Sequence, residues 1–420
     1  MHDAEIRPHA PTRRMRTPAD GSLARTLWRI TSSGRVDLAA RTLAERRAWP
    51  LRLGEILTTT DPASVDATIR NGIGWIARGQ DYWRCGGIPA SYNARTRRYD
   101  GPYPETTGYS IPTLLALGQD RRASRAAEWL VSRQLGNGAI RCNIEPPGTT
   151  APAPEEIVIF DCGAILQGLT AMARRKVPYE APARRLAEFL VATQAASGTW
   201  DRHLAFPAFG SHNALVGYAL LEAGVTLDAP AIRDAGHRCL AALRPRLRPD
   251  GYIEGCEFPG VRPGVAFLHP FVYTIEGFLK AEEIAPGHGY LDAVRPAVDA
   301  LHDEIRRTDR VPGAFVNADL TTSTGFTALT AIAQLADVGF KADRMDGAGR
   351  YSGISRRLMH RLRACCASSL DDAEWVGGLP SAYPIDGGYL PFCVNNWGLK
   401  YLLDASLEER HTLDTSGGTP

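Results

Sequence analysis

The chain has 420 residues, of which 44% are hydrophobic and 22% charged, and a formal net charge of +2. This composition is typical of a globular protein with a large core, and the near-neutral charge gives no indication of a nucleic-acid partner. No run of about eighteen apolar residues occurs, so we expect no membrane span. The eight cysteines form no Cys-x-x-Cys motif, which argues against a zinc ribbon or a disulfide framework and favours a reducing cytoplasm.

Residues 1–50 form a basic extension, with ten arginines against five acidic residues. Prolines are frequent before residue 20, and we expect this start to be mobile. A helical lead-in is predicted from Ser22 to Ala48, packed on the outside of the main domain rather than acting as a binding arm. Arginines near the start are not followed by an apolar stretch or a small-residue cleavage site, so we expect no secretory signal.

From Asp61 onward the sequence repeats a glycine-containing turn between two helical segments. The turns include Leu135–Ile140, Ala196–Trp200 and Pro249–Ile253, and the glycines of the series fall at positions 87, 138, 198, 251, 313 and 378. Their intervals of 51 to 65 residues suit one helical hairpin per repeat. The recurrence therefore predicts six hairpins.

The two helices of each repeat differ in character. In the third repeat Leu186, Phe189 and Leu190 form one apolar face between charged residues, as in an outer helix with a solvated side. Residues 214–221 are apolar nearly all round, which predicts a buried inner helix. The same contrast pairs segments 63–79 with 105–117, 122–134 with 161–173, 230–243 with 269–282, 291–306 with 323–336 and 351–366 with 391–403.

These repeats predict an all-α fold, an (α/α)6 toroid of six helical hairpins around a central cavity. The toroid is expected to occupy residues 51–405 and to be followed by a disordered tail at 406–420. The short β-branched run Ile157–Phe160 leads directly into a helix, so we expect no sheet. The loops that enter the inner helices would line one mouth of the cavity, and we expect the functional groups there.

A turn motif carries the first resemblance. Gln194–Trp200 reads Q-A-A-S-G-T-W, and Gln134–Ile140 repeats the pattern with Ile in place of Trp. The motif resembles the QxxxGxW repeat of the squalene/hopene cyclase and prenyltransferase superfamily of α/α toroids. The resemblance implies a structural role, in which the glutamine caps neighbouring helix ends and the aromatic ring closes the turn.

The chemistry of that superfamily is not expected here. The Asp-x-Asp-Asp acid motif of the cyclases is absent. Asp161 stands directly beside Cys162, and adjacent side chains on a helix do not point at one zinc ion. We therefore predict neither a metal nor a cofactor.

A second resemblance points to carbohydrates. Tyr103–Leu114 reads Y-P-E-T-T-G-Y-S-I-P-T-L and resembles the P-E-x-x-G-Y/W-x-I-P-T segment in the C-terminal toroid of glucuronyl C5-epimerases. Val394–Tyr401 resembles the closing inner helix of the same toroids and of VpsJ-type polysaccharide-biosynthesis proteins. The resemblance implies a role in making or modifying a polysaccharide, with a polysaccharide or oligosaccharide as the partner.

Polar and aromatic residues near the starts of the inner helices suit a sugar site. Carboxylates, histidines and tyrosines supply general acids and bases, arginines bind carboxylates through two hydrogen bonds, and flat rings can stack on pyranose faces. We predict catalytic roles for Glu105, Tyr109, Asp161, His212 and Tyr273. We predict substrate-binding roles for Tyr82, Trp83, Arg84, Tyr92, Arg141, Arg202, Asn213, His269, Asn395, Asn396 and Trp397.

Most of these residues also have a structural interpretation. Glu105 and Asp161 each open a helix, where a carboxylate satisfies free N–H groups and complements the helix dipole. His212 could extend a helix cap, and His269 could be a hydrogen-bonded core histidine. Glu276 lies in a buried stretch and needs a charged partner, which favours a network role. Each aromatic ring is also compatible with the core.

Three functions stay open. The first is an enzyme that abstracts the C5 proton of a uronate in a polysaccharide, giving epimerisation or elimination. Arg84 or Arg202 would neutralise the carboxylate, His212 or Glu105 would be the base, and one of the two predicted tyrosines would be the acid.

The second function is a glycoside hydrolase that uses Glu105 and Asp161 as paired carboxyl groups across the cleft. The third is a non-catalytic glycan-binding or assembly factor of an exopolysaccharide pathway. Terpenoid cyclisation is the least favoured function, because the residues at the mouth are too polar.

Overall fold

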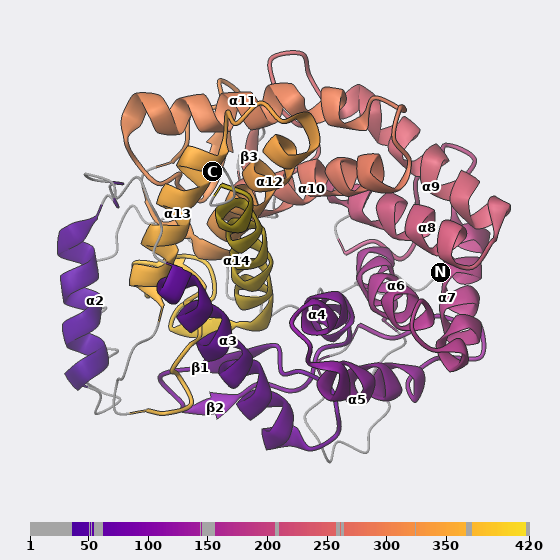
Figure 1. The fold of residues 1–420 in the computed structure, drawn as a ribbon, viewed down its shortest axis with the longest axis horizontal. Coiled ribbons are helices and arrows are strands. Elements are labelled where there is room, and N and C mark those ends of the chain that lie inside the picture. Colours follow the sequence, from indigo (N-terminus) through magenta and orange to yellow (C-terminus); the bar gives the residue numbers. More distant parts are fainter. Residues whose placement is uncertain are drawn as a thin grey trace, which may run out of the picture.

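The computed structural model describes residues 36–49, 51, 53, 62–142, 144, 156–205, 210–257, 261, 264–323, 325–366 and 372–416. Their helices form two concentric rings, and the chain alternates between the rings (Figure 1). The outer ring contains α3 (Pro62–Trp83), α5 (Asp120–Val131), α7 (Glu180–Thr193), α9 (Pro230–Leu243), α11 (Tyr290–Thr308) and α13 (Ser352–Cys365). The inner ring contains α4 (Pro104–Ala116), α6 (Ile159–Ala173), α8 (Ala214–Thr226), α10 (Leu268–Ile284), α12 (Leu329–Asp346) and α14 (Asn396–Ser416).

The inner ring is closed, because each inner helix contacts the next and α14 contacts α4. Its helices are buried on nearly every side, as the sequence predicts: every residue of 214–224 in α8 and of 329–343 in α12 is buried. The protein is therefore an (α/α)6 toroid. None of the helices in the described ranges is long and apolar enough to cross a membrane.

Glycines allow two inner helices, α4 and α6, to pack closely. A Cβ atom on Gly108 would lie 2.4 Å from Cα of Ile165, and one on Gly168 would lie 2.3 Å from the carbonyl oxygen of Gly108. Real Cβ atoms do not make such contacts with backbone atoms. The absence of side chains at these positions therefore brings the starts of α4 and α6 together.

The glutamines of the turn motif join neighbouring repeats, as the superfamily resemblance implies. Nε2 of Gln194 donates to the carbonyl oxygens of Gly198 (2.8 Å) and Ala235 (3.0 Å), the second of which lies in the next outer helix. Gln134 makes the equivalent bonds in the preceding repeat. The Trp200 indole donates to the carbonyl oxygen of Leu190 at 3.0 Å and closes its turn.

Short antiparallel strands precede several inner helices, where the sequence predicts no sheet. β1 (Ser91–Asn93) lies between β2 (Arg98–Tyr99) and β7 (Cys393–Asn395), β3 (Val265–Phe267) pairs with β4 (Phe315–Asn317), and β5 (Thr327–Ala328) pairs with β6 (Ala382–Tyr383). The strands delay the start of α12 to Leu329 and of α14 to Asn396. Since β1 belongs to the first repeat and β7 to the last, their pairing also closes the ring.

The two ends of the chain pack on the toroid. α2 (Val36–Ala48) confirms the described part of the predicted lead-in, while residues 1–35 and 417–420 lie outside the described residues. Arg46 of α2 pairs with Asp386. The predicted disorder from residue 406 is wrong up to residue 416, because α14 continues through that segment. Its Glu409 is buried and pairs with Arg363 of α13 at 2.7 Å, which holds the extra turns in place.

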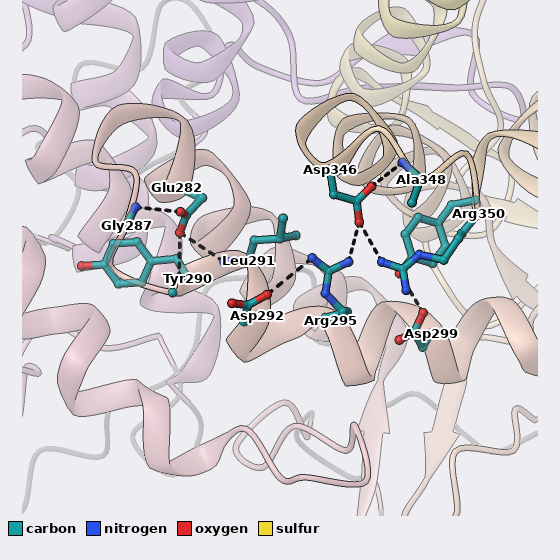
Figure 2. A network of polar contacts seen from close by, with 12 residues as sticks. Glu282, Gly287, Tyr290, Leu291, Asp292, Arg295, Asp299, Asp346, Ala348 and Arg350 are labelled. Atoms are coloured by element: carbon teal, nitrogen blue, oxygen red, sulfur yellow. Dashed lines mark hydrogen bonds and ion pairs between the residues drawn. The ribbon is translucent and has the colours of Figure 1, made fainter.

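Polar contacts fix the helix connections at the C-terminal ends of the inner helices (Figure 2). The Glu282 carboxylate at the end of α10 accepts hydrogen bonds from the backbone N–H groups of Gly287 (3.0 Å) and Tyr290 (2.7 Å). At the end of α12, the Asp346 carboxylate accepts from Arg295 of α11 at 2.6 Å and from Arg350 at 2.7 Å. These contacts stiffen the frame that holds the site at the opposite ends of the inner helices.

Candidate functional site

Most of the predicted site residues lie at the N-terminal ends of the inner helices. Glu105 and Asp161 occupy the first turns of α4 and α6. His212 and Asn213 form the short helix η2 (Ser211–Asn213) directly before α8, and His269 lies in the first turn of α10. Because each outer helix returns the chain to the same end of the ring, these side chains come from separate repeats to one region.

Glu105 and Asp161 form a buried carboxyl pair. Their exposed fractions are 9% and 4%, and the hydroxyl of Tyr103 donates a hydrogen bond of 2.8 Å to Oδ2 of Asp161. Burial raises the pKa of Glu105 to about 7, against a smaller lowering by the Tyr103 hydroxyl. Burial and then the charge of Glu105 raise the pKa of Asp161 well above its usual value. At neutral pH the pair therefore keeps at least one proton.

Aromatic rings and two histidines form a wall beside this pair. The ring of Phe160, which precedes Asp161 in α6, lies 4.9 Å from the ring of His212 and 5.1 Å from that of Tyr273. The Tyr273 ring is in turn 4.3 Å from the ring of His269. Phe160 thus contacts the predicted His212 and Tyr273, and Tyr273 contacts the predicted His269.

Both histidines are neutral at physiological pH. Burial, then His269 and Arg246, lower the pKa of His212 to about 4. Burial lowers the pKa of His269 to about 4, against the opposing effect of Gln334. Nδ1 of His269 lies 2.6 Å from Oε1 of Gln334, so with the amide in this orientation Nδ1 is the donor and Nε2 keeps its lone pair. Neutral imidazoles of this kind can accept a proton.

Several buried polar atoms around the wall have no hydrogen-bond partner within the described part of the chain. They are Oδ1 of Asn213, Nε2 of Gln334 and Oδ1 of Asn396. An unsatisfied buried polar group costs about 1–3 kcal/mol, and such groups are rare in folded proteins. These atoms are candidates for hydrogen bonds to substrate hydroxyl groups.

Several predicted substrate-binding residues lie at exposed or partly buried positions. Tyr82, Arg84 and Arg202 are exposed, and the Trp83 indole donates to the carbonyl oxygen of Asp100 at 2.6 Å. Arg141 is partly buried. A ligand-binding role for these residues stays a prediction.

Two predicted substrate-binding residues are engaged in packing near the β1–β7 pair. Tyr92 is 1% exposed and its hydroxyl donates to Asp372. Asn395 is fully buried, and its amide donates to Ser381 at 2.9 Å. A ligand-binding role for either residue stays a prediction. Asn396 similarly bonds Thr106 at 2.7 Å but keeps a free oxygen.

Five residues that the sequence analysis did not select belong to the site, including Phe160 of the aromatic wall. Tyr103 lies within the quoted epimerase-like segment, so that motif is the signal that could have found it. Tyr389 accepts a hydrogen bond of 2.8 Å from the predicted Trp397, and its ring lies 6.0 Å from that of His269. Gln334 and Arg246 reach the site only through contacts between repeats, for which the sequence carries no local signal.

The ion pairs of Glu276 confirm its predicted network role. Its carboxylate is 1% exposed and lies 2.7 Å from Nζ of Lys280 and 3.9 Å from Nζ of Lys400. Burial would raise its pKa, but these cations outweigh burial and hold the pKa at about 2. Lys280, Lys400 and Lys341, which pairs with Asp337 at 2.6 Å, are three of the four lysines in the sequence. The network fills the inner ring beneath the site with paired charges.

The fold is shared with sugar-processing enzymes of known structure. An unsaturated glucuronyl hydrolase specific for heparin is similar over 84% of this chain and 99% of its own, with a TM-score of 0.64 and 14% identity. A D-mannose isomerase matches over 85% and 99%, with a TM-score of 0.66 and 10% identity. A sugar epimerase from a ruminal bacterium matches over 86% and 99%, with a TM-score of 0.65 and 11% identity.

The chain has the fold of these enzymes. Neither a protein-family model nor a curated protein matches its sequence. The resemblances to the cyclase superfamily, the C5-epimerases and the VpsJ-type proteins therefore stay predictions beyond the shared toroid. Reaction type and substrate have to be argued from the site.

Proposed function

We propose that the protein is a carbohydrate-processing enzyme that hydrolyses a glycosidic bond with Glu105 and Asp161. The observation that carries the proposal is the buried, mutually interacting carboxyl pair on two adjacent inner helices. Glycoside hydrolases usually use two carboxyl groups. Their environments differ, so that one is protonated and acts as the acid while the other is ionised. The similarity in fold to sugar-processing enzymes supports the same conclusion.

The two carboxyl groups have different roles in this mechanism. Asp161, whose pKa burial and the Glu105 charge raise well above its usual value, donates its proton to the glycosidic oxygen as the C1–O bond breaks. Glu105, whose burial-raised pKa of about 7 leaves part of it ionised at neutral pH, removes a proton from the attacking water. Water supplies the new C1–O bond, and the proton that Glu105 gains replaces the one that Asp161 lost. General acid–base catalysis of this kind contributes about 10²–10⁴-fold to a rate.

A second candidate is abstraction of the C5 proton of a uronate, leading to epimerisation or elimination. The observation in its favour is the pair of neutral histidines beside Tyr273, which could take a proton on one side of a sugar ring and return it from a tyrosine. The arginines first predicted to hold the carboxylate, Arg84 and Arg202, are both exposed. For this reason the carboxyl pair carries more weight than the histidines.

We also propose a cytoplasmic setting and a polysaccharide or oligosaccharide substrate. All eight cysteines are free thiols, as is usual in a reducing compartment. The polysaccharide substrate rests on the epimerase-like segment and on the wall of rings beside the carboxyl pair.

The test uses purified full-length protein with a panel of neutral and uronate-containing polysaccharides in D₂O. Reducing-end release, absorbance of unsaturated uronate and deuterium at C5 separate hydrolysis, elimination and epimerisation. We expect reducing ends to rise. Deuterium at C5, or unsaturated uronate formed together with the new reducing ends, would replace hydrolysis by the second candidate, and binding without any turnover would indicate a glycan-binding or assembly factor.

Matched variants separate catalysis from helix capping. Glu105→Gln and Asp161→Asn should lower the rate by at least about 100-fold. Glu180→Gln and Asp120→Asn are the controls, because both are exposed acids in the first turn of an outer helix. If the control variants lose as much activity as the site variants, the carboxylates act through helix stability rather than proton transfer.

A further inference from the structure

Arg246 is a half-buried arginine without a carboxylate partner among the residues that the structure describes. It ends the short helix η3 (Arg244–Arg246), and its Nη1 donates one long hydrogen bond of 3.4 Å to Oγ of Ser211. Other partly buried arginines differ: Arg295 lies 2.6 Å from Asp346, and Arg363 lies 2.7 Å from Glu409. A guanidinium carries five N–H donors, so most of the hydrogen-bonding capacity of Arg246 is unused.

Gly255 makes room for this guanidinium, and Gly210 lies beside it. A Cβ atom on Gly255 would lie 2.6 Å from Nη1 of Arg246 and 2.9 Å from Oγ of Ser211. A Cβ atom on Gly210 would lie 3.8 Å from Nη1 of Arg246 and 3.6 Å from Nδ2 of Asn213. The Arg246 and Asn213 donors therefore lie on either side of the position that a Cβ atom of residue 210 would occupy.

The free guanidinium lies on the His212 side of the carboxyl pair. Its charge contributes to the low pKa of His212, after burial and His269. The His212 ring contacts Phe160, the residue directly before Asp161. A ligand group held by Arg246 would thus be next to the aromatic wall, and its sugar ring could extend toward Asp161.

We propose that Arg246 and Asn213 form a binding subsite for the carboxylate of an acidic sugar residue. The guanidinium matches a carboxylate through two parallel hydrogen bonds. Oδ1 of Asn213, which is buried and has no partner in the described residues, accepts a hydrogen bond from a neighbouring sugar hydroxyl. A carboxylate beside a hydroxyl is the recognition pattern of a uronic acid. The subsite specifies the substrate class of the proposed hydrolase. It rests on that function only in that the bound uronic acid would belong to the substrate that is cleaved.

The test measures binding rather than turnover. Titration calorimetry and ligand-observed NMR would compare oligogalacturonate, hyaluronan oligosaccharides and oligoglucuronate with neutral cello-oligosaccharides of matched length. We expect the wild-type protein to bind at least one acidic series. Arg246→Met should weaken that binding at least tenfold and leave neutral sugars unaffected, whereas Arg246→Lys, which keeps the charge but loses the paired donors, should weaken it less.

Arg121→Met is the matched control, because Arg121 is an exposed arginine of the outer helix α5 and has no predicted role in binding. Its binding of acidic sugars should be unchanged. The proposal fails if no acidic oligosaccharide binds saturably, if Arg246→Met leaves affinity intact, or if it weakens neutral and acidic sugars equally. Circular dichroism and the melting temperature establish that the variants fold, and Asn213→Ala supplies a second variant at the same subsite.

The outcome is separable from that of the proposed hydrolysis. Acidic-sugar binding that depends on Arg246, with no release of reducing ends by any substrate, would overturn the reaction and support the subsite. Hydrolysis of a uronate-containing polysaccharide that is unaffected by Arg246→Met would support the reaction and overturn the subsite.

Discussion

The hydroxyl of Tyr103 lies 2.8 Å from Oδ2 of Asp161, although the two residues are 58 positions apart in the sequence. Tyr103 precedes α4, and Asp161 lies in the first turn of α6. The hydrogen bond therefore crosses from one helical hairpin to the next. It favours the ionised form of Asp161, in opposition to burial and to the charge of Glu105, and so makes Tyr103 a positioning residue for the pair.

Replacing Tyr103 by Phe should move the whole pH–activity profile to higher pH. The Tyr103 hydroxyl lowers the pKa of both Glu105 and Asp161, so both carboxyl groups should bind protons more tightly without it. Initial rates of the wild type and the variant across pH 4–9 measure the shift. Tyr82→Phe is the control, since the Tyr82 ring is 52% exposed. A uniform loss of rate without a shift would show that Tyr103 supports only the local packing.

The free energy of unfolding should depend on Glu105 between pH 4.5 and 7. Burial raises its pKa from the usual 4.5 to about 7, so its contribution is fully present below pH 4.5 and is lost as the pH rises through 7. A shift of this size corresponds to about 3 kcal/mol. Urea denaturation should show this decline in the wild type and a smaller one in Glu105→Gln. Parallel curves for the two proteins would contradict a raised pKa.

Adding a methyl group at Gly108 should damage both stability and activity. The new Cβ would lie 2.4 Å from Cα of Ile165 and would push α4 away from α6, the helices that carry Glu105 and Asp161. Overpacking of this kind costs typically about 1–3 kcal/mol. Gly353→Ala in α13 is the control, because nothing lies within 4 Å of its added Cβ. Equal effects of the two substitutions on the melting temperature would refute the close-packing argument.

Removing the glutamine of the turn motif should destabilise the toroid without altering the site. Gln194→Ala loses the hydrogen bonds to Gly198 and Ala235, which together should cost about 2 kcal/mol. Its pH–activity profile should match that of the wild type, because the turn lies in the outer part of its repeat. Gln119→Ala, which loses one weak bond of 3.4 Å, should unfold at nearly the wild-type urea concentration. A shifted pH profile in Gln194→Ala would give the motif a catalytic role.

The arrangement of the helices in an outer and an inner ring could be predicted from local patterns. The glycine turns, the amphipathic segment around Leu186 and Phe189 and the apolar segment 214–221 each report their own environment, because helical periodicity reflects burial along one element. The starts of α12 and α14 were misplaced by several residues, since β5 and β7 form only against strands from other repeats. The helical end of α14 was missed because Glu409 is stabilised by Arg363 of another helix.

In the candidate site, too, some features follow from the local sequence and others depend on contacts between repeats. The sequence by itself determined a six-hairpin toroid and placed Glu105, Asp161, His212 and Tyr273 at the starts of inner helices, because residue type and helix boundaries are local properties. Only the tertiary structure decided that Tyr103 bonds Asp161, that Gln334 holds His269 and that Arg246 lies close to His212. Those choices depend on contacts between different repeats, and no residue's own neighbourhood in the chain encodes which distant side chain it will meet.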